Sequence, residues 1–299
     1  MNTHAKADTL ARPTLVKPDP HSPALKVTGR DSLVIKAGTV FAGRAFAEDT
    51  AVRHAGLIPG ADYAVRLADG EWGAEHLAGI PTGDDLLGGF HFAPGGNAAA
   101  RAGGDDIPAI NPFSLWDIAF RPACPDPRGM AFIAGAAKPF WCDIYLTGVD
   151  HLAAGTSRFG VAIADGDDLP RDAKGRKVKR FDYETAVAVM AAHGKGLLSL
   201  EEFFAAAHGV TEQSAAERDP KITGLDAERT SRFGLMQATG NLWIWGHDGD
   251  PDAPCASTFG GSWLGGGSAG SRHASVGAWP AASFDDLGAR GRSDPLQPV

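Results

Sequence analysis

The stretch that decides the fold begins with Gly240-Asn241-Leu242-Trp243-Ile244-Trp245 and continues, after an acidic turn, with Phe259-Gly260-Gly261-Ser262-Trp263. In the first segment two aliphatic side chains alternate with two tryptophans, so both faces of an extended chain are apolar, which is typical of a buried strand. The second segment predicts another aromatic strand, whose glycines allow a neighbouring backbone to approach closely. We therefore expect buried, glycine-rich β structure in the last sixty residues.

Two helices are expected before these strands. The first is predicted over residues 182–193, because Asp182 is a good N-cap and Gly194 a good C-terminal stop. The second follows Ser199, which forms a capping box with Glu202, and runs to His208. Two helices set among short strands indicate an α+β fold, with both helices packed on small antiparallel sheets.

The composition divides the chain into three parts. Residues 1–28 are polar and proline-rich, which predicts a flexible arm or an extended segment docked on a neighbour. Residues 29–80 contain short apolar runs between turn residues and predict a small all-β domain. The third part is residues 81–299, in which the glycine pairs of 81–130 predict irregular loops rather than regular strands or helices.

Charge and composition exclude several classes of protein. Apolar residues make up 43% of the 299 residues, but no run of 18 apolar residues occurs, so no transmembrane helix is expected. The N-terminus has no apolar segment of the kind that a signal peptide requires. The formal net charge of −8 argues against a general nucleic-acid or anionic-membrane binder, since either would need a basic face.

The three cysteines, Cys124, Cys142 and Cys255, form no C-x-x-C pair, and an odd number cannot close into a complete set of disulfides. We expect free, mostly buried thiols in a protein that is made in a reducing compartment.

Two sequence patterns known from enzymes occur in the chain, but the structural context that each requires is not predicted around them. Residues 266–270 fit G-x-S-x-G, but the sequence after them does not predict the helix that a nucleophile elbow needs. Residues 265–270 also fit G-x-G-x-x-G, but no βαβ unit surrounds them. Both are interpreted as glycine-rich loop.

Asp248, Asp250 and Asp252 alternate along an acidic turn, a spacing at which carboxylates can surround a hard cation such as Ca²⁺. The glycine and glutamate positions of an EF-hand are missing, so a solvated turn is the preferred interpretation. The histidines show no zinc-binding spacing.

Arg272 and Arg290 each stand beside glycine, and both are expected to bind loop carbonyls, because a guanidinium offers five donors in a rigid fork. Together with Trp243, Trp245 and Trp263 they are interpreted as scaffold.

The C-terminal part resembles the C-type lectin fold shared by formylglycine-generating-type domains and by variable proteins of diversity-generating retroelements. Within that group it is similar to the phage major tropism determinants, which are receptor-binding tail-fibre proteins. The segments that carry the resemblance are 197–209, 240–245, 259–294 with Gly270-Ser271-Arg272 and Gly288-Ala289-Arg290-Gly291, and, upstream, 87–92, 114–117, 120–130 and 141–146. It covers about residue 80 to the end and is weaker over 31–75.

In that family a retroelement rewrites chosen codons, and the altered side chains share one exposed face of a rigid scaffold. The resemblance places these variable, receptor-binding positions at Ser262, Leu264, Gly265, Gly266, Ser268, Ser275, Gly277, Ala278, Ala282, Phe284, Asp286 and Leu287. Small residues dominate this set, and Phe284 and the neighbouring Trp279 are the aromatic exceptions.

The resemblance implies a homotrimeric receptor-binding protein of a virion tail, not an enzyme. It would recognise a host-surface protein through its C-terminal face, and its N-terminal arm would contact other tail or baseplate proteins. The chain is short at its N-terminus for this family, so the family's trimerising β-prism is expected to be missing.

The alternatives are a variable ligand-binding protein displayed on a bacterial cell, an oxidase of the formylglycine-generating type, and a calcium-dependent sugar lectin. The oxidase would need reactive cysteines after Trp263, where residues 264–271 have none. The lectin would need Glu-Pro-Asn or Gln-Pro-Asp, and neither occurs.

Overall fold

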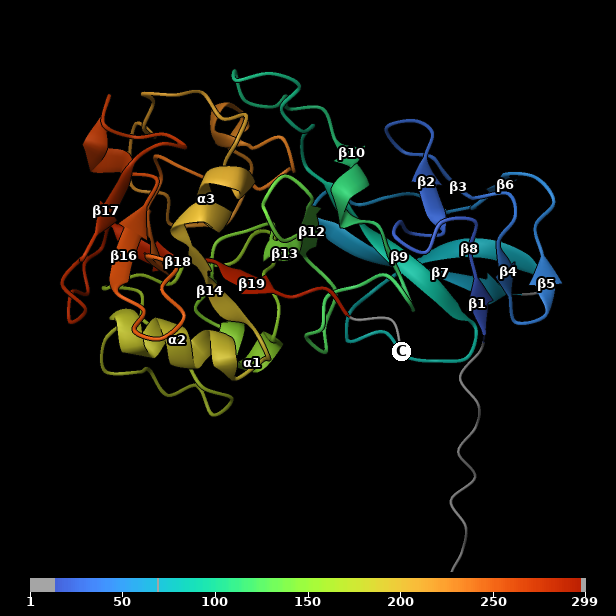
Figure 1. Cartoon of the computed structure of the whole chain (residues 1–299), viewed down its shortest axis with the longest axis horizontal. Helices are drawn as coiled ribbons and strands as arrows, with labels where there is room; N and C mark the ends of the chain where they lie inside the picture. The colour runs from blue at the N-terminus through green and yellow to red at the C-terminus, as the bar shows by residue number, and fades with distance from the viewer. Residues whose placement is uncertain (1–13, 69, 297–299) are drawn as a thin grey trace, which may run out of the picture.

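The computed structural model describes residues 14–68 and 70–296. Strands β1–β11 lie at one end of the molecule (Figure 1), and strands β14–β18 lie with the helices at the other end. Strands β12, β13 and β19 lie between these two ends. The mixed α and β content predicted from the sequence is confirmed.

Antiparallel sheets build the N-terminal end. Two of them have three strands each: β1 (Leu15–Val16), β4 (Val40–Phe41) and β5 (Arg44–Ala45), and β2 (Leu25–Val27), β3 (Leu33–Ile35) and β6 (Thr50–Ala51). The third contains β7 (Ala61–Ala68), β8 (Glu71–His76), β9 (Leu86–Ala93), β10 (Ala109–Ile110) and β11 (Trp116–Asp117). Their buried faces share one core, which includes Ile35, Phe41, Trp72 and Phe90.

Strand β9 differs from the loop that its glycines predict. All eight of its residues are buried, and it pairs with β7, β10 and β11. A Cβ at Gly88 would lie 2.1 Å from the Trp116 carbonyl oxygen, and one at Gly89 would lie 2.3 Å from that of Tyr63. The glycines therefore allow neighbouring strands to approach closely instead of marking a loop. A domain boundary at residue 80 would also cut this sheet between β8 and β9.

The N-terminal segment is docked over the part that the structure describes. Asp117 is completely buried and accepts hydrogen bonds from Lys17 Nζ at 2.9 Å and from the Ala24 backbone N–H at 2.7 Å. Lys17 and Ala24 therefore attach this segment to the five-stranded sheet, and its strands β1 and β2 pair with β4 and β3 in the three-stranded sheets. Residues 1–13 lie outside the described residues.

An eight-stranded sheet organises the rest of the chain. Its strands are β12 (Met130–Ile133), β13 (Phe140–Asp143), β14 (Gly196–Ser199), β15 (Trp243–His247), β16 (Ala256–Phe259), β17 (Ala274–Val276), β18 (Leu287–Ala289) and β19 (Gly291–Ser293). The order is β12-β13-β19-β14-β15-β16-β17, with β18 also on β15. Because β15 runs parallel to both β14 and β18, the sheet is mixed and larger than the small antiparallel sheets predicted.

The helices agree with their capping signals. Helix α2 (Tyr183–Ala191) is capped by Asp182, and α3 (Leu200–Ala206) has the predicted capping box of Ser199 and Glu202. A short α1 (His151–Ala154) and three 3-10 turns, Pro112–Ser114, Ala227–Arg229 and Trp263–Gly265, were not predicted. In the described part of the chain, no helix has the length and apolar character needed to cross a membrane.

The alternation in β15 separates two cores, as the sequence predicts. Leu242 and Ile244 join the cluster that contains Phe203 of α3, whereas Trp245 joins the cluster that contains Val189 of α2. The Trp245 indole N–H donates to the Phe181 carbonyl at 3.2 Å.

Arg290 confirms the expectation of a structural arginine. Its buried guanidinium donates to the carbonyl oxygens of Asp143, Ile144, Met236 and Gln237 at 2.7–3.2 Å. The corresponding expectation for Arg272 is wrong: this side chain is exposed and makes no hydrogen bond to any described residue. Its neighbour Ser271 instead holds the loop, by donating to Glu212 from both its hydroxyl and its backbone N–H.

Candidate binding face

A hollow opens on one face of the eight-stranded sheet, over strands β15 to β18, and its floor follows from the strand register. Trp245 pairs with Thr258, and Thr258 pairs with Ser275, so these three side chains form one row across β15, β16 and β17. Trp243 pairs with Leu287 on the other side of β15. Residues opposite one another in a sheet share a face, so the row and this pair line the same depression.

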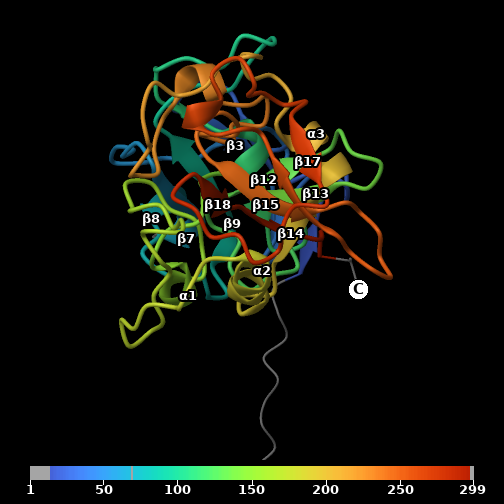
Figure 2. The ribbon, with the colours of Figure 1, turned by 90° about the vertical axis from the view of Figure 1, so that its left-hand side faces the viewer.

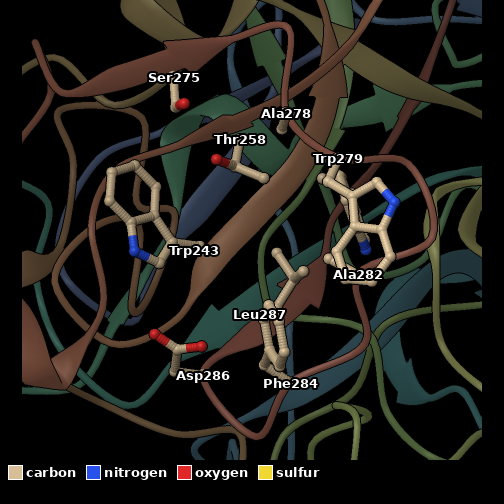
Figure 3. Close-up of a pocket in the computed structure, with 10 residues that line it drawn as sticks. Trp243, Thr258, Ser275, Ala278, Trp279, Ala282, Phe284, Asp286 and Leu287 are labelled. Carbon is tan, nitrogen blue, oxygen red and sulfur yellow. The ribbon is translucent and has the colours of Figure 1, made fainter.

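Loop residues complete the hollow, which has a volume of about 300 Å³. Figure 3 shows Trp279, Phe284 and Asp286 around the floor residues. Trp279 is 66% exposed and Phe284 is 54% exposed. Two large aromatic side chains thus remain open to solvent beside an apolar depression.

Asp286 is held in place at its backbone and at its side chain. Its carbonyl accepts from the Trp243 N–H at 2.9 Å, and its carboxylate Oδ2 accepts from the Ser262 hydroxyl at 2.8 Å. The second contact joins the hollow to the neighbouring Trp263–Gly265 turn, so the two loops that carry the predicted variable positions are connected.

The wall around Phe284 rests on a separate segment. The Gly166 N–H donates to the Phe284 carbonyl at 2.9 Å, and a Cβ on this glycine would lie 2.5 Å from the Phe284 nitrogen. The Phe181 N–H donates to the Ser283 hydroxyl at 3.0 Å. Phe284 therefore stands on a backbone that two hydrogen bonds hold in place.

The structure places the twelve predicted positions in two neighbouring groups. Six of them line the hollow: Ser275, Ala278, Ala282, Phe284, Asp286 and Leu287. Five lie on or next to the 3-10 turn, namely Ser262, Leu264, Gly265, Gly266 and Ser268, and Gly277 is an exposed turn residue after β17. Ser262, Ala282 and Leu287 are buried, so little of these three side chains is open to a partner. We call the hollow and this turn the binding face.

Four lining residues, Trp243, Trp245, Thr258 and Trp279, were not among the twelve predicted positions, and Trp243 and Trp245 were interpreted as scaffold alone. Trp243 is only partly buried and contributes one side of the hollow. The alternation of the strand gave the signal, because it places Trp243 on the same face as Trp245.

The acidic turn is not arranged as a cation site. Among the described residues, no group of three His, Cys, Asp or Glu side chains is placed to hold a metal ion. Asp248 instead accepts from the backbone N–H groups of Cys255 and Asp250, and these bonds lower the pKa of its carboxyl group. Asp250 accepts in the same way from Asp252 and Ala253.

The three cysteines are free, as predicted, with Cys124 and Cys142 buried and Cys255 exposed. Burial raises the pKa of the Cys124 thiol and raises that of Cys142 to about 12. The two buried thiols are therefore poor nucleophiles near neutral pH.

Comparisons with known proteins show which family the chain belongs to. The family profile described as the Mtd second domain matches residues 23–117. A tail fiber receptor-binding protein of Bordetella phage BPP-1 is 39% identical, over 96% of this chain and 86% of that protein. The solved structures of the Major Tropism Determinant I1 and P3c variants are each 38% identical and superpose with a TM-score of 0.87, over 96% of this chain and 87% of theirs.

Proposed function

Because the chain belongs to the major tropism determinant family, we propose that it is a receptor-binding protein of a phage tail fibre and that its binding face recognises a protein on the host surface. The names of the relatives describe receptor-binding and tropism-determining proteins, not enzymes. The observation that carries the proposal for this chain is the pair of exposed aromatics, Trp279 and Phe284, beside an apolar hollow. Exposed aromatic side chains around a depression are typical hot spots of protein interfaces.

The C-type lectin fold of the family supports exchange of contacts without loss of the scaffold. The floor belongs to paired strands, whereas Leu264, Ser268 and Phe284 stand on loops. Loops on a rigid framework tolerate substitution better than the framework does. We propose that the exposed members of the twelve positions vary among relatives of this chain. A reverse transcriptase gene nearby, and a near-copy of the codons for residues 259–294 that differs mainly at adenines, would support this; an isolated gene would contradict it.

We also propose that the protein works as a homotrimer in the virion tail, with the N-terminal segment toward other tail proteins. Several linked copies convert weak single contacts into firm attachment, because linkage raises the effective concentration of each site. Light scattering of the full chain at micromolar concentration should give three times the mass of one chain. A monomer alone would contradict the trimer but not receptor binding.

Two alternative functions, display on a bacterial cell and oxidase activity, make different predictions from the tail-fibre proposal. Display on a bacterial cell would use the same face, and the location of the protein in purified virions distinguishes the two. The oxidase would need a low-pKa thiol, whereas burial raises the pKa of Cys124 and Cys142.

The main test removes the two exposed aromatics. The variant Trp279→Ala with Phe284→Ala should lose host-cell binding by about 2 kcal/mol or more, as hot-spot truncations do. The control Ile58→Ala with Ile107→Ala removes two exposed apolar side chains, 63% and 52% exposed, from the N-terminal end. Adsorption of labelled protein to host cells and thermal unfolding are measured for both. Wild-type adsorption by the aromatic variant would contradict the proposal.

A further inference from the structure

We propose that an exposed basic hairpin over residues 171–180, beside the binding face, binds clustered phosphate groups of lipids in the host envelope. The proposal adds a second contact surface, and it rests on the proposed function only in placing the protein at a host surface. The hairpin lies in the segment between α1 and α2, which loops outward at the lower left of Figure 2.

Backbone and side-chain hydrogen bonds define the conformation of the hairpin. Arg171 and Lys177 form an antiparallel bridge, and the Val178 N–H donates to the Pro170 carbonyl at 2.9 Å. At the tip, the Asp172 carboxylate accepts from the backbone N–H groups of Lys174 and Arg176, both at 2.9 Å. Gly175, with a φ of 76°, supplies the left-handed turn. The hairpin therefore holds its side chains on a defined backbone.

The hairpin carries a strong local charge in an acidic protein. Residues 171–180 contain six Lys or Arg and one acidic residue, whereas the whole chain has a net charge of −8. That acidic residue, Asp172, is occupied by the turn and by Arg176 Nε at 2.8 Å. Arg180 is paired with Asp182 at 3.6 Å. Among the described residues, no acidic group lies within ion-pair distance of Lys174, Lys177 or Lys179, and all three are exposed.

The base of the hairpin is attached to the binding face. Phe181, the residue after the hairpin, accepts from the Trp245 indole and donates to Ser283, while the Tyr183 N–H donates to the Pro280 carbonyl at 3.1 Å. Trp245 lines the hollow, and Ser283 and Pro280 flank Phe284 and Trp279. The C-terminal end of the hairpin is therefore joined by hydrogen bonds to the hollow and to the loop that carries Trp279 and Phe284.

The chemistry favours phosphate. Unpaired lysine ammonium groups are compact, mobile charges that bind phosphate oxygens without requiring a fixed geometry. Clusters of four to eight Lys or Arg bind anionic lipid surfaces, and each such residue near the surface adds to the attraction. The net charge of the whole chain is negative, so it did not indicate this local cluster of basic residues. An acidic molecule approaching an anionic envelope would be turned with the hairpin, and therefore the binding face, toward it.

The test uses the full chain and two variants of equal net charge. Lys174→Gln with Lys177→Gln and Lys179→Gln neutralises the hairpin, whereas Lys26→Gln with Arg53→Gln and Lys138→Gln removes three exposed charges elsewhere. Binding is measured by co-sedimentation with vesicles of phosphatidylcholine alone, of phosphatidylcholine with phosphatidylglycerol, and of lipopolysaccharide. Polyglutamate and inorganic phosphate serve as competitors, and circular dichroism checks folding.

The wild type and the control should bind both phosphate-bearing vesicles at low salt and not phosphatidylcholine alone. The hairpin variant should bind about tenfold or more weakly, and high salt should abolish the difference. The proposal would be overturned if the two variants lost vesicle binding equally or if the wild type did not bind the vesicles. It would also be overturned if polyglutamate competed with the vesicles and inorganic phosphate did not. The variant Trp279→Ala with Phe284→Ala should bind the vesicles like the wild type, so this result does not depend on the receptor.

Discussion

Arg290 links two segments that are distant in sequence and that are also joined by a backbone hydrogen bond, from the Met236 N–H to the Ile144 carbonyl at 2.9 Å. Its four acceptors lie on residues 143–144 and 236–237, which no strand ladder joins directly. We expect Arg290→Met to lower the free energy of unfolding by about 3–5 kcal/mol, because four buried carbonyls each lose a hydrogen bond from the guanidinium while the side-chain volume is roughly retained. Arg272→Met, at an exposed position, should change it by about 0.5 kcal/mol or less in urea denaturation. Equal effects of the two substitutions would contradict the assignment.

His151 is a buried group that makes the fold sensitive to acid. It is completely buried, and neither ring nitrogen has a hydrogen-bond partner among the described residues. Burial, together with Lys195 and His193, holds its pKa well below the usual 6.5. Below about pH 6.5, His151 binds a proton in the unfolded chain but not in the folded chain. The free energy of unfolding therefore falls as the pH falls from about 6.5 toward the lowered pKa of the folded state.

We expect His151→Leu to remove this part of the pH dependence, because an apolar side chain needs no hydrogen-bond partner there. Urea denaturation at intervals from pH 5 to pH 8 should give a smaller loss of stability on acidification than in the wild type. Other groups, such as the buried Asp143, contribute equally to both proteins and cancel in the difference. The same slope in both proteins would show that His151 does not carry the effect.

The capping box of α3 connects this helix to the central sheet. Ser199 ends β14, and its hydroxyl accepts from the Glu202 N–H at 3.2 Å, while Glu202 accepts from the Ser199 N–H at 2.9 Å. Ser199→Ala should destabilise the protein by about 1 kcal/mol, because one N–H at the helix start loses its acceptor. Ser268→Ala, in an exposed loop, is the control and should have little effect in thermal unfolding. A loss no larger than that of the control would mean that solvent caps the helix equally well.

The elements that the sequence predicts well are those with local causes. Asp182 and Ser199 determine where two helices begin, and the alternation of residues 242–245 determines which side chains enter which core. Strand β9 was missed because its glycines are required by Trp116 and Tyr63, which lie elsewhere in the sequence. The parallel pairs of β15 were missed for the same reason, since nothing within a strand specifies its distant neighbour.

The candidate site was predicted in part. The resemblance placed Phe284 and Asp286 in a region where the structure has a hollow. It did not indicate that Ser262 and Leu287 are buried, or that Trp243 forms one side, because these depend on the register between β15, β18 and the loops. Arg272 was misassigned because an arginine beside glycine looks the same in sequence whether its guanidinium faces carbonyls or solvent.

The described N-terminal segment is attached to the chain at the point where the N-terminal sheets end and the C-terminal part begins. Asp117 ends β11, and its carboxylate binds Lys17 and the backbone of Ala24 with one oxygen and the N–H groups of Ala119 and Phe120 with the other. Lys17 also lies 5.5 Å from the centroid of the Phe120 ring. One buried carboxylate thus fixes the start of the described chain to the turn that leads into the C-terminal part.

Asp117→Ala should release this segment from the body of the protein. Removing one partner of a buried ion pair leaves the other charge without compensation, at a cost of about 3–5 kcal/mol. Residues 14–28 should then exchange their backbone amide protons faster, as hydrogen–deuterium exchange measures, and overall stability should fall. Glu71→Ala is the control, because it breaks the exposed Arg53–Glu71 pair in the same end of the molecule, where such pairs contribute about 1 kcal/mol or less. If protection of residues 14–28 were unchanged in Asp117→Ala, the strand pairs β1–β4 and β2–β3, rather than the carboxylate, would hold the segment in place.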